Sequence, residues 1–289
     1  MRRKTDFSIK GITFFGTGGS VDLFFAPSSV CELQEFINSA DKSIPIVALG
    51  HMSNVVVSDD GFRGGVVCFG HAFESVLFDA TDNVVFVEAG VDINNLIKQC
   101  IGKGISCVEE MYCIPGTVGG AIFMNAGTPL FEISEAVVKV ECINKKNGKI
   151  VKLNKSDINF QYRKSNIDDD LIITSCVLKM RKGNVDVLAN RISEIARKRR
   201  QTQPIAERTC GSTFKNPAGE KAWQLIDRSG CRGMRVGGAF VSDLHCNFII
   251  NDGTATSADI INLIEQIKKK VFRNTNILLE EEIRLLGSL

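Results

Sequence analysis

At residues 114–127 the chain reads Ile-Pro-Gly-Thr-Val-Gly-Gly-Ala-Ile-Phe-Met-Asn-Ala-Gly. Three glycines and a proline fall within its first seven residues, and a small, apolar run follows. Glycines at this density allow positive φ angles and let a bulky ligand approach the main chain closely. The N–H groups of such a turn can also bind an anion such as a pyrophosphate. The stretch therefore predicts either a ligand-binding loop or a tight turn between two strands.

A second loop has a similar character. It reads Gly-His-Met-Ser-Asn at residues 50–54, between two apolar runs at 46–49 and 55–57 that are typical of short buried strands. Neither loop is a P-loop, because no Gly-Lys-Ser/Thr follows, and neither has the Gly-x-Gly-x-x-Gly spacing of a Rossmann site. Two such loops, each after a strand, suggest a ligand that lies between two lobes.

The composition excludes several classes of protein. Hydrophobic residues make up 44% of the 289 residues and charged residues 24%, as in globular proteins. The net charge of +2 indicates no general attraction to nucleic acid or to an anionic membrane. No apolar run approaches the roughly 20 residues that span a bilayer. No apolar segment follows the basic first residues, so we expect neither a membrane span nor a signal peptide.

The ten cysteines bear on metal binding and on the cellular compartment. They are scattered singly, without a Cys-x-x-Cys pair, so neither a zinc site nor a redox motif is predicted. Most lie within apolar runs, where cysteine acts as a small hydrophobic residue. We therefore expect mostly free thiols, no bound metal and a reducing, cytoplasmic setting.

Local patterns predict where several helices begin. Ser29 and Glu32 can form a capping box ahead of an apolar helical face, and Asp92 can cap the next helix. Thr256 and Asp259 resemble the start of a third helix near the end of the chain. These helices alternate with short apolar strands, which indicates α/β lobes.

The succession of these elements predicts two domains. Residues 1–182 contain two lobes, at about 1–72 and 73–182, and Gly183 begins a plausible boundary. Residues 183–289 form the second domain, which opens with a helix that carries four consecutive basic residues at 197–200.

Two polar clusters could take part in catalysis. Arg163, within Tyr-Arg-Lys-Ser at 162–165, is permanently charged and suited to bind a carboxylate or an enolate, although a lone arginine more often forms a surface salt bridge. Ser212 could protonate a carbanion, and Lys215 could stabilise the resulting alkoxide. A hydrolase is not indicated, because Ser212 lacks the Gly-x-Ser-x-Gly context.

The last cluster is acidic and lies near the end of the chain. Residues 278–286 are predicted to form a strand in which Glu280 and Glu282 share one face. Either carboxylate could be a buried general acid or base. The alternative is a charged edge strand without a catalytic role.

Together and in order, these motifs resemble the family of UDP-N-acetylenolpyruvoylglucosamine reductases, bacterial flavoenzymes of peptidoglycan precursor synthesis. The similarity extends over nearly the whole chain, in blocks at residues 16–23, 49–57, 114–127, 160–165, 211–217, 235–248 and 279–284. Two departures are visible. His51 and Met52 occupy positions where the family usually has small residues, and Thr-Pro-Leu-Phe follows Gly127 in place of the commoner Ala-Tyr-Gly. The absence of a long insertion between Lys182 and Gln203 indicates the shorter, second subtype.

The resemblance implies an α+β fold, with a two-lobed FAD-binding domain of the vanillyl-alcohol-oxidase/PCMH type and a C-terminal α+β substrate domain. It also implies FAD as the cofactor. The cofactor-binding positions carried over by motif are Leu49, Gly50, His51, Met52, Ser53, Asn54, Pro115, Gly116, Thr117, Gly119, Gly120, Asn125, Ala126 and Gly127.

The resemblance further implies a mechanism. NADPH passes a hydride to FAD, and the enolpyruvyl ether of UDP-N-acetylglucosamine then accepts it at its terminal methylene carbon. Arg163 and Glu282 stabilise the resulting enolate, and Ser212 protonates the other carbon to give UDP-N-acetylmuramate. The implied substrate-binding residues are Tyr162, Lys215 and Asn216. We expect a monomer with no nucleic-acid or membrane partner.

Three alternatives differ in class or substrate. The first is another oxidoreductase with the same type of FAD domain, which the substrate-end motifs at 211–217 and 279–284 argue against. The second is a non-catalytic flavin or nucleotide-sugar binder, which the joint presence of Arg163, Ser212 and Glu282 argues against. The third is a nucleic-acid binder that uses the basic run at 197–200, and no interleaved aromatic residues support it.

Overall fold

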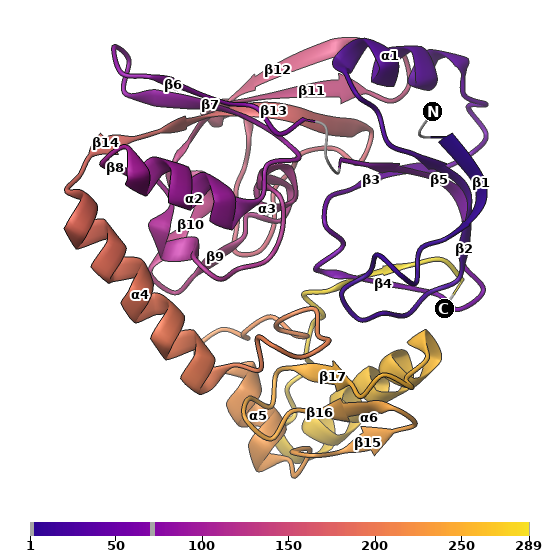
Figure 1. The fold of residues 1–289 in the computed structure, drawn as a ribbon. Helices are drawn as coiled ribbons and strands as arrows, with labels where there is room; N and C mark the ends of the chain where they lie inside the picture. Colours follow the sequence, from indigo (N-terminus) through magenta and orange to yellow (C-terminus); the bar gives the residue numbers. More distant parts are fainter. Residues whose placement is uncertain (1–2, 70–72, 289) are drawn as a thin grey trace. The chain divides into compact units, whose positions relative to one another are not determined.

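The computed structural model describes residues 3–69 and 73–288, and the chain forms two compact units (Figure 1). Unit 1 is built from Phe24–His51 and Gly64–Lys198, together with the start of the chain. Unit 2 is built from Thr5–Leu23, Met52–Arg63 and Arg199–Leu289. The chain therefore contributes to each unit from several separate segments. The predicted lobe boundary near residue 72 lies outside the described residues.

The first sheet has the strand order β1-β2-β5-β3, and its strands β1, β2 and β5 contain residues of both units. Strands β3 and β5 pair in parallel. Helix α1 begins where predicted, because Ser29 Oγ accepts the Glu32 amide and the Glu32 carboxylate accepts the Ser28 amide. The elements are β1 (Arg3–Ser8), β2 (Ser20–Phe25), α1 (Val30–Ser39), β3 (Ile46–Leu49) and β5 (Phe62–Cys68).

The second sheet lies wholly in unit 1 and is antiparallel throughout, with the order β12-β11-β13-β7-β6. Its strands are β6 (Val76–Asp79), β7 (Val84–Glu88), β11 (Val137–Asn144), β12 (Ile150–Asn154) and β13 (Leu171–Lys179). Helix α2 (Ile93–Gly102) packs its apolar side into the same core as β7 and β13. Asp92 caps this helix as predicted, because its carboxylate accepts the Asn95 amide at 2.8 Å.

The glycine-rich stretch at 114–127 contains a short helix, α3 (Val118–Met124), in place of an uninterrupted loop. Val118, Ala121 and Ile122 are buried and recur at helical spacing, and they contribute to the core of unit 1. The two adjacent glycines concealed this pattern, because glycine has a low helix propensity. The ligand-binding or turn segment is therefore shorter than the sequence suggested.

Short elements complete unit 1. Two-stranded pairs form between β8 and β14 and between β9 and β10. These strands are β8 (Ile105–Ser106), β9 (Gly127–Thr128), β10 (Phe131–Glu132) and β14 (Arg181–Lys182), with 3₁₀ turns η1 (Glu109–Met111), η2 (Ile133–Glu135) and η3 (Lys155–Asp157). Helix α4 (Val185–Thr202) leads from unit 1 into unit 2. Its residue Arg191 binds Glu110 through two nitrogen atoms, at 2.7 and 2.8 Å.

Unit 2 has its own core around helix α6 (Ser257–Thr275). The predicted capping box of Thr256 and Asp259 is present, and the apolar face of α6 is buried. A three-stranded antiparallel sheet, β15-β16-β17, and a parallel pair, β4 with β18, belong to the same unit. The remaining elements are β4 (Val55–Val57), α5 (Ala222–Arg228), β15 (Arg235–Val236), β16 (Ala239–Val241), β17 (Ile249–Asn251) and β18 (Arg284–Leu286).

The strand predicted at 278–286 is wrong in its extent. Only Arg284–Leu286 forms a strand, and Glu281 makes an isolated bridge with Phe214. The preceding residues follow the left-handed cap of α6 at Asn276 and lie against a loop, not against a neighbouring strand. The expected shared face of Glu280 and Glu282 therefore does not follow from strand alternation.

The cysteines behave as the sequence indicated. All ten are free thiols, and six of them are buried. Burial raises the pKa of the Cys142 and Cys210 thiols to about 12, so both are neutral near pH 7. Among residues 3–69 and 73–288, none of the helices has the length and apolar character needed to cross a membrane.

Asp59 caps helix α6 from a distant part of the chain, and its removal is expected to destabilise unit 2. Its two carboxylate oxygens accept the amides of Ser257 and Ala258, each at 2.9 Å, at the positive end of the helix dipole. We predict that Asp59→Ala lowers the free energy of unfolding in urea by about 1 kcal/mol. Asp60→Ala, which removes a neighbouring exposed carboxylate, is the control. Equal effects of the two substitutions would contradict the prediction.

Candidate active site

The start of the loop at 50–54 meets the glycine-rich stretch at 114–127 in unit 1. Gly50 lies so close to Thr117 that a Cβ atom at residue 50 would overlap the Thr117 hydroxyl. Gly119 is also closely packed, because a Cβ atom there would lie 2.8 Å from Ala89 Cβ. The close approach of the Thr117 side chain at 50 and of Ala89 at 119 therefore favours glycine at both positions. The expectation that both loops serve one ligand agrees with this contact.

Hydrogen bonds within the chain use several amides that the sequence suggested for anion binding. The amides of Val118 and Gly119 donate to Val91 and Ala89 carbonyls, each at 2.9 Å, and the Gly120 amide donates to Thr117 Oγ1. The amides of Gly116 and Thr117 have no acceptor among the residues that the structure describes. Any main-chain anion cradle in this loop therefore uses 116 and 117, not the glycine pair.

His51 and Met52 are both held by the protein. The imidazole Nδ1 of His51 lies 3.6 Å from Asp92 Oδ2, and about a third of each side chain is exposed. Met52 is buried, and its φ of 54° is in the left-handed region. The Asp92 carboxylate, which caps α2, thus also contacts the loop at 50–54. Of the two residues that depart from the family pattern, His51 lies against this carboxylate and Met52 is buried.

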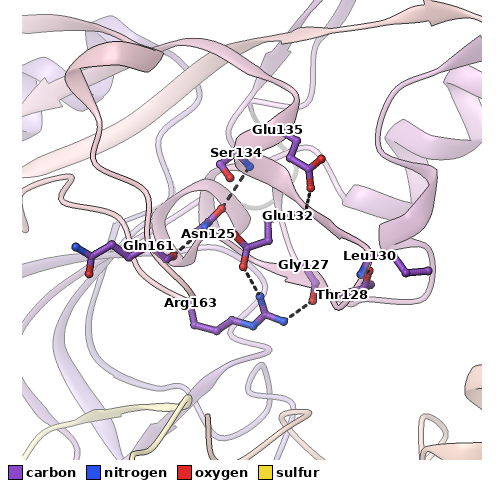
Figure 2. Close-up of polar contacts among 9 residues, drawn as sticks. All are labelled: Asn125, Gly127, Thr128, Leu130, Glu132, Ser134, Glu135, Gln161 and Arg163. Carbon is purple, nitrogen blue, oxygen red and sulfur yellow. Dashed lines mark hydrogen bonds and ion pairs between the residues drawn. The ribbon is translucent and has the colours of Figure 1, made fainter. Parts of the chain in front are cut away.

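Arg163 is held in unit 1 by the loop that follows α3 (Figure 2). Its Nη2 donates to the Gly127 carbonyl at 2.7 Å, and Nη1 lies 3.3 Å from Glu132 Oε1. The Tyr162 ring centroid lies 4.9 Å from the guanidinium carbon. Only 11% of the Arg163 side chain is exposed, so this arginine does not form an ordinary surface salt bridge.

Asn125, at the end of α3, organises the same cluster. It has a left-handed conformation with φ of 46°, and its side chain donates to Glu132 Oε2 at 2.8 Å and to the Gln161 carbonyl at 2.9 Å. Its Oδ1 accepts the Ser134 amide. The predicted cofactor residues Asn125 and Gly127 are therefore bonded to the same group of residues as the predicted catalytic Arg163 (Figure 2).

Ser212 lies in unit 2 on a loop that Asn247 supports. The main-chain carbonyl of Asn247 accepts the Thr213 amide at 2.8 Å. The side-chain amide of Asn247 accepts a hydrogen bond from the Phe214 N–H and donates one to the Phe214 carbonyl. Phe214 is buried in the core of unit 2. His245 Nδ1 accepts the Asn247 amide, and burial lowers the pKa of His245, which favours the neutral imidazole that this bond needs. The Ser212 loop is thus fixed at its main chain.

Glu282 lies beside the Ser212 loop. Its amide donates to the Thr213 carbonyl at 2.8 Å, and its carbonyl accepts Asn54 Nδ2 at 3.0 Å. The Arg284 amide donates to the Asn54 carbonyl, so the end of the chain is bonded to the segment that carries the 50–54 loop. Within unit 2 the structure therefore joins Ser212, Glu282 and Asn54, which are far apart in the sequence.

The neighbouring lysine and glutamate side chains are paired. Lys215 Nζ binds the Glu280 carboxylate, and Lys268 Nζ binds the Glu281 carboxylate at 2.6 Å. Asn216 Oδ1 accepts the Ala222 amide at the start of α5. Lys215, on the same loop as Ser212, is thus paired with the Glu280 carboxylate. The sequence did not indicate this ion pair.

Two supporting residues were not found by sequence reasoning. Glu132 contacts both Asn125 and Arg163, and Asn247 supports the Ser212 loop. Their contacts to the site residues are remote in sequence, because Phe214 is 33 residues from Asn247 and Arg163 is 31 residues from Glu132. Asn247 does lie within the family-like block at 235–248, but that resemblance assigned it no role.

Two family models match the chain. A model described as an FAD binding domain matches residues 21–154, and a model described as the C-terminal domain of UDP-N-acetylenolpyruvoylglucosamine reductase matches residues 203–286. The first range includes both glycine-rich loops, and the second includes Ser212 and Glu282. Arg163 lies between the two ranges. The models confirm the expected order of an FAD-binding domain and a C-terminal domain.

The relatives are similar over the full length. Proteins named UDP-N-acetylenolpyruvoylglucosamine reductase from Rickettsia massiliae and Rickettsia felis are 40% and 39% identical to this chain over 284 residues. Each comparison covers 98% of this chain and 95% of the relative. The crystal structure of the reductase of that name from Thermus caldophilus matches with a TM-score of 0.84 at 30% identity, covering 99% of this chain and 98% of that chain.

The contact between Gly50 and Thr117 can be tested by adding one methyl group. We predict that Gly50→Ala weakens FAD binding by tenfold or more, because one loop must move and such overpacking costs about 1–3 kcal/mol. The dissociation constant of FAD, measured by flavin fluorescence on deflavinated protein, is the readout. Gly102→Ala is the control, because a Cβ atom at 102 would meet no other atom within 4 Å. An unchanged FAD affinity in Gly50→Ala would show that the contact does not shape the site.

Proposed function

Since this chain belongs to the family of UDP-N-acetylenolpyruvoylglucosamine reductases, we propose that it reduces UDP-N-acetylglucosamine enolpyruvate to UDP-N-acetylmuramate with NADPH as the hydride donor. Its FAD-binding domain and C-terminal domain make it an FAD-dependent oxidoreductase. The observation that best supports the proposed reaction is the main-chain bond from Glu282 to Thr213, next to Ser212. This bond places the segment that carries Glu282 next to the segment that carries Ser212. The proposed reaction needs both residues.

The residues of the two loops fit a bound FAD. Gly50 lets its loop pack against the Thr117 side chain, Gly119 lets α3 pack against Ala89, and the amides of Gly116 and Thr117 can donate to a phosphate. We propose that residues 49–54, 115–117, 119–120 and 125–127 hold the cofactor. When bound, FAD supplies the redox chemistry, because it can accept a hydride from NADPH and deliver it to carbon.

Arg163 is proposed to bind the carboxylate of the enolpyruvyl group and to stabilise the charge that develops on it. The guanidinium is permanently charged, largely shielded from water and fixed by Gly127 and Glu132 before any substrate arrives. A fixed cation in a dry site can lower the barrier by several kcal/mol, since no reorganisation is needed during the reaction. Tyr162, whose ring lies beside the guanidinium, is proposed to contact the substrate.

Ser212 is proposed to supply the proton. Hydride addition at the terminal methylene carbon leaves an electron pair shared by the neighbouring carbon and the carboxylate. The Ser212 O–H bond breaks as its proton passes to that carbon, which forms the second of the two new C–H bonds and leaves an alkoxide that Lys215 is proposed to stabilise. Glu282 is proposed to assist Arg163 at the same group, and Lys215 and Asn216 to contact phosphates of the substrate or of NADPH.

The wider biological assignment is also part of the proposal. The product is a precursor of peptidoglycan, so we propose a role in cell-wall synthesis, within the cytoplasm and as a monomer. Residues 1–182 are proposed to serve cofactor binding and residues 183–289 substrate binding. No role in binding nucleic acid or membrane is proposed.

The role of Ser212 can be tested by separating the two half-reactions. We predict that Ser212→Ala leaves anaerobic flavin reduction by NADPH within about twofold of wild type but slows reoxidation by the enolpyruvyl substrate by a hundredfold or more, since a general acid typically contributes about 10²–10⁴-fold. Stopped-flow absorbance of the flavin measures both steps. Ser193→Ala, at an exposed position of α4, is the control. Survival of both half-reactions in Ser212→Ala would refute the proton-donor role.

A further inference from the structure

Glu132 lies between two residues of the candidate site and contacts both (Figure 2). Its Oε1 lies 3.3 Å from Arg163 Nη1, and its Oε2 accepts Asn125 Nδ2 at 2.8 Å. The two carboxylate oxygens are thus divided between the predicted catalytic arginine and a predicted cofactor residue. A carboxylate in this position can hold both partners in one fixed geometry.

Glu132 is itself held by local structure. Its amide donates to Glu135 Oε1 at 2.9 Å in the capping box of η2, and residue 132 pairs with Gly127 in the two-stranded β9–β10 sheet. Gly127 is also the residue whose carbonyl accepts Arg163 Nη2. The Gly127 and Glu132 contacts to the guanidinium therefore come from one small hairpin, whose two strands carry the carbonyl and the carboxylate.

The main chain at both partners of Glu132 is in an unfavourable region. Asn125 and Arg163 have φ angles of 46° and 54°, which residues other than glycine rarely adopt. Arginine is found at such angles less often than asparagine. Such conformations cost about 1–3 kcal/mol each and persist only where surrounding contacts over-determine them. Glu132 contacts both residues, so it is suited to hold this conformation.

The burial of the pair makes the carboxylate more important than at the surface. The exposed fractions are 11% for the Arg163 side chain and 30% for that of Glu132. A buried guanidinium without a partner is strongly unfavourable, and charge-assisted hydrogen bonds in such a site are strong and directional. Removing Glu132 would leave Arg163 with fewer constraints on its orientation.

We infer that Glu132 is a positioning residue, which fixes the guanidinium of Arg163 in the orientation that meets the substrate's carboxylate. The inference rests on the proposed role of Arg163 and extends it to a residue that does not touch the substrate. Glu132 acts only through Arg163 in the reaction, while its bond to Asn125 keeps the same hairpin attached to the end of α3.

Four variants separate this role from a structural one: Glu132→Ala, Glu132→Gln, Arg163→Ala and the double variant Glu132→Ala/Arg163→Ala. Glu132→Ala is expected to slow flavin reoxidation at saturating substrate by about ten- to a hundredfold, as for other lost bonds to a charged group. Flavin reduction by NADPH, measured on the FAD-loaded protein, should stay within about twofold of wild type, because this step does not use the orientation of Arg163. Glu132→Gln has the same size but one acceptor oxygen, so its rate should fall between those of wild type and Glu132→Ala.

The double variant gives the decisive comparison. If Glu132 acts through Arg163, the double variant is no slower in reoxidation than Arg163→Ala alone, because the effects of coupled residues do not add. Glu194→Gln, which alters an exposed carboxylate on α4, is the control and should leave reoxidation unchanged. Thermal unfolding of every variant checks that the fold is retained, and Glu132→Gln replaces Glu132→Ala in the cycle if the alanine variant does not fold.

The outcomes distinguish the inference from the proposed function. Normal reoxidation in Arg163→Ala would refute the proposed role of Arg163 and, with it, the inference. Slow reoxidation in Arg163→Ala together with normal reoxidation in both Glu132 variants would refute the inference alone. Fully additive losses in the double variant would show that Glu132 acts independently of Arg163, which also overturns the inference.

Discussion

The close approach of Gly50 to Thr117 is the constraint on which the arrangement of unit 1 depends. It requires a residue without a side chain at 50, and it brings the end of β3 against the start of α3. Two helix-capping residues, Thr117 and Asp92, lie at this contact or next to it. Thr117 caps α3, and Asp92 caps α2 while its carboxylate faces His51. The same polar groups that begin the helices therefore also contact the loops proposed to bind the cofactor.

Unit 2 achieves a comparable rigidity by different means. The Ser212 loop is not part of a helix or a strand. Hydrogen bonds to Asn247 and to Glu280 and Glu282 near the end of the chain hold its main chain. Buried Phe214 anchors the loop in the core, and the final segment connects it to Asn54. Such support suits the proposed role of Ser212 as proton donor, because small displacements of a reacting group are costly.

The sequence predicted those features that depend on neighbouring residues. The caps at Asp92 and at Thr256 with Asp259, and the buried face of α6, were predicted because each depends on residues within a few positions of one another. Helix α3 was missed because its glycines obscure the helical period, and the final strand was overextended because its partner, a loop around Phe214, is remote in sequence. For the same reason the roles of Glu132 and Asn247 became visible only in the folded chain. The family and the cofactor were predictable, since ordered motifs along the whole chain carry that information.

The central claim is that one flavin site passes a hydride from NADPH to an enolpyruvyl ether. The most direct measurement is an anaerobic titration of the FAD-loaded wild-type protein, first with NADPH and then with UDP-N-acetylglucosamine enolpyruvate, followed by flavin absorbance and by identification of the product. The account predicts that NADPH bleaches the flavin and that one equivalent of the enolpyruvyl substrate restores its colour and yields UDP-N-acetylmuramate. A flavin that NADPH reduces but that stays reduced in the presence of this substrate would contradict the account.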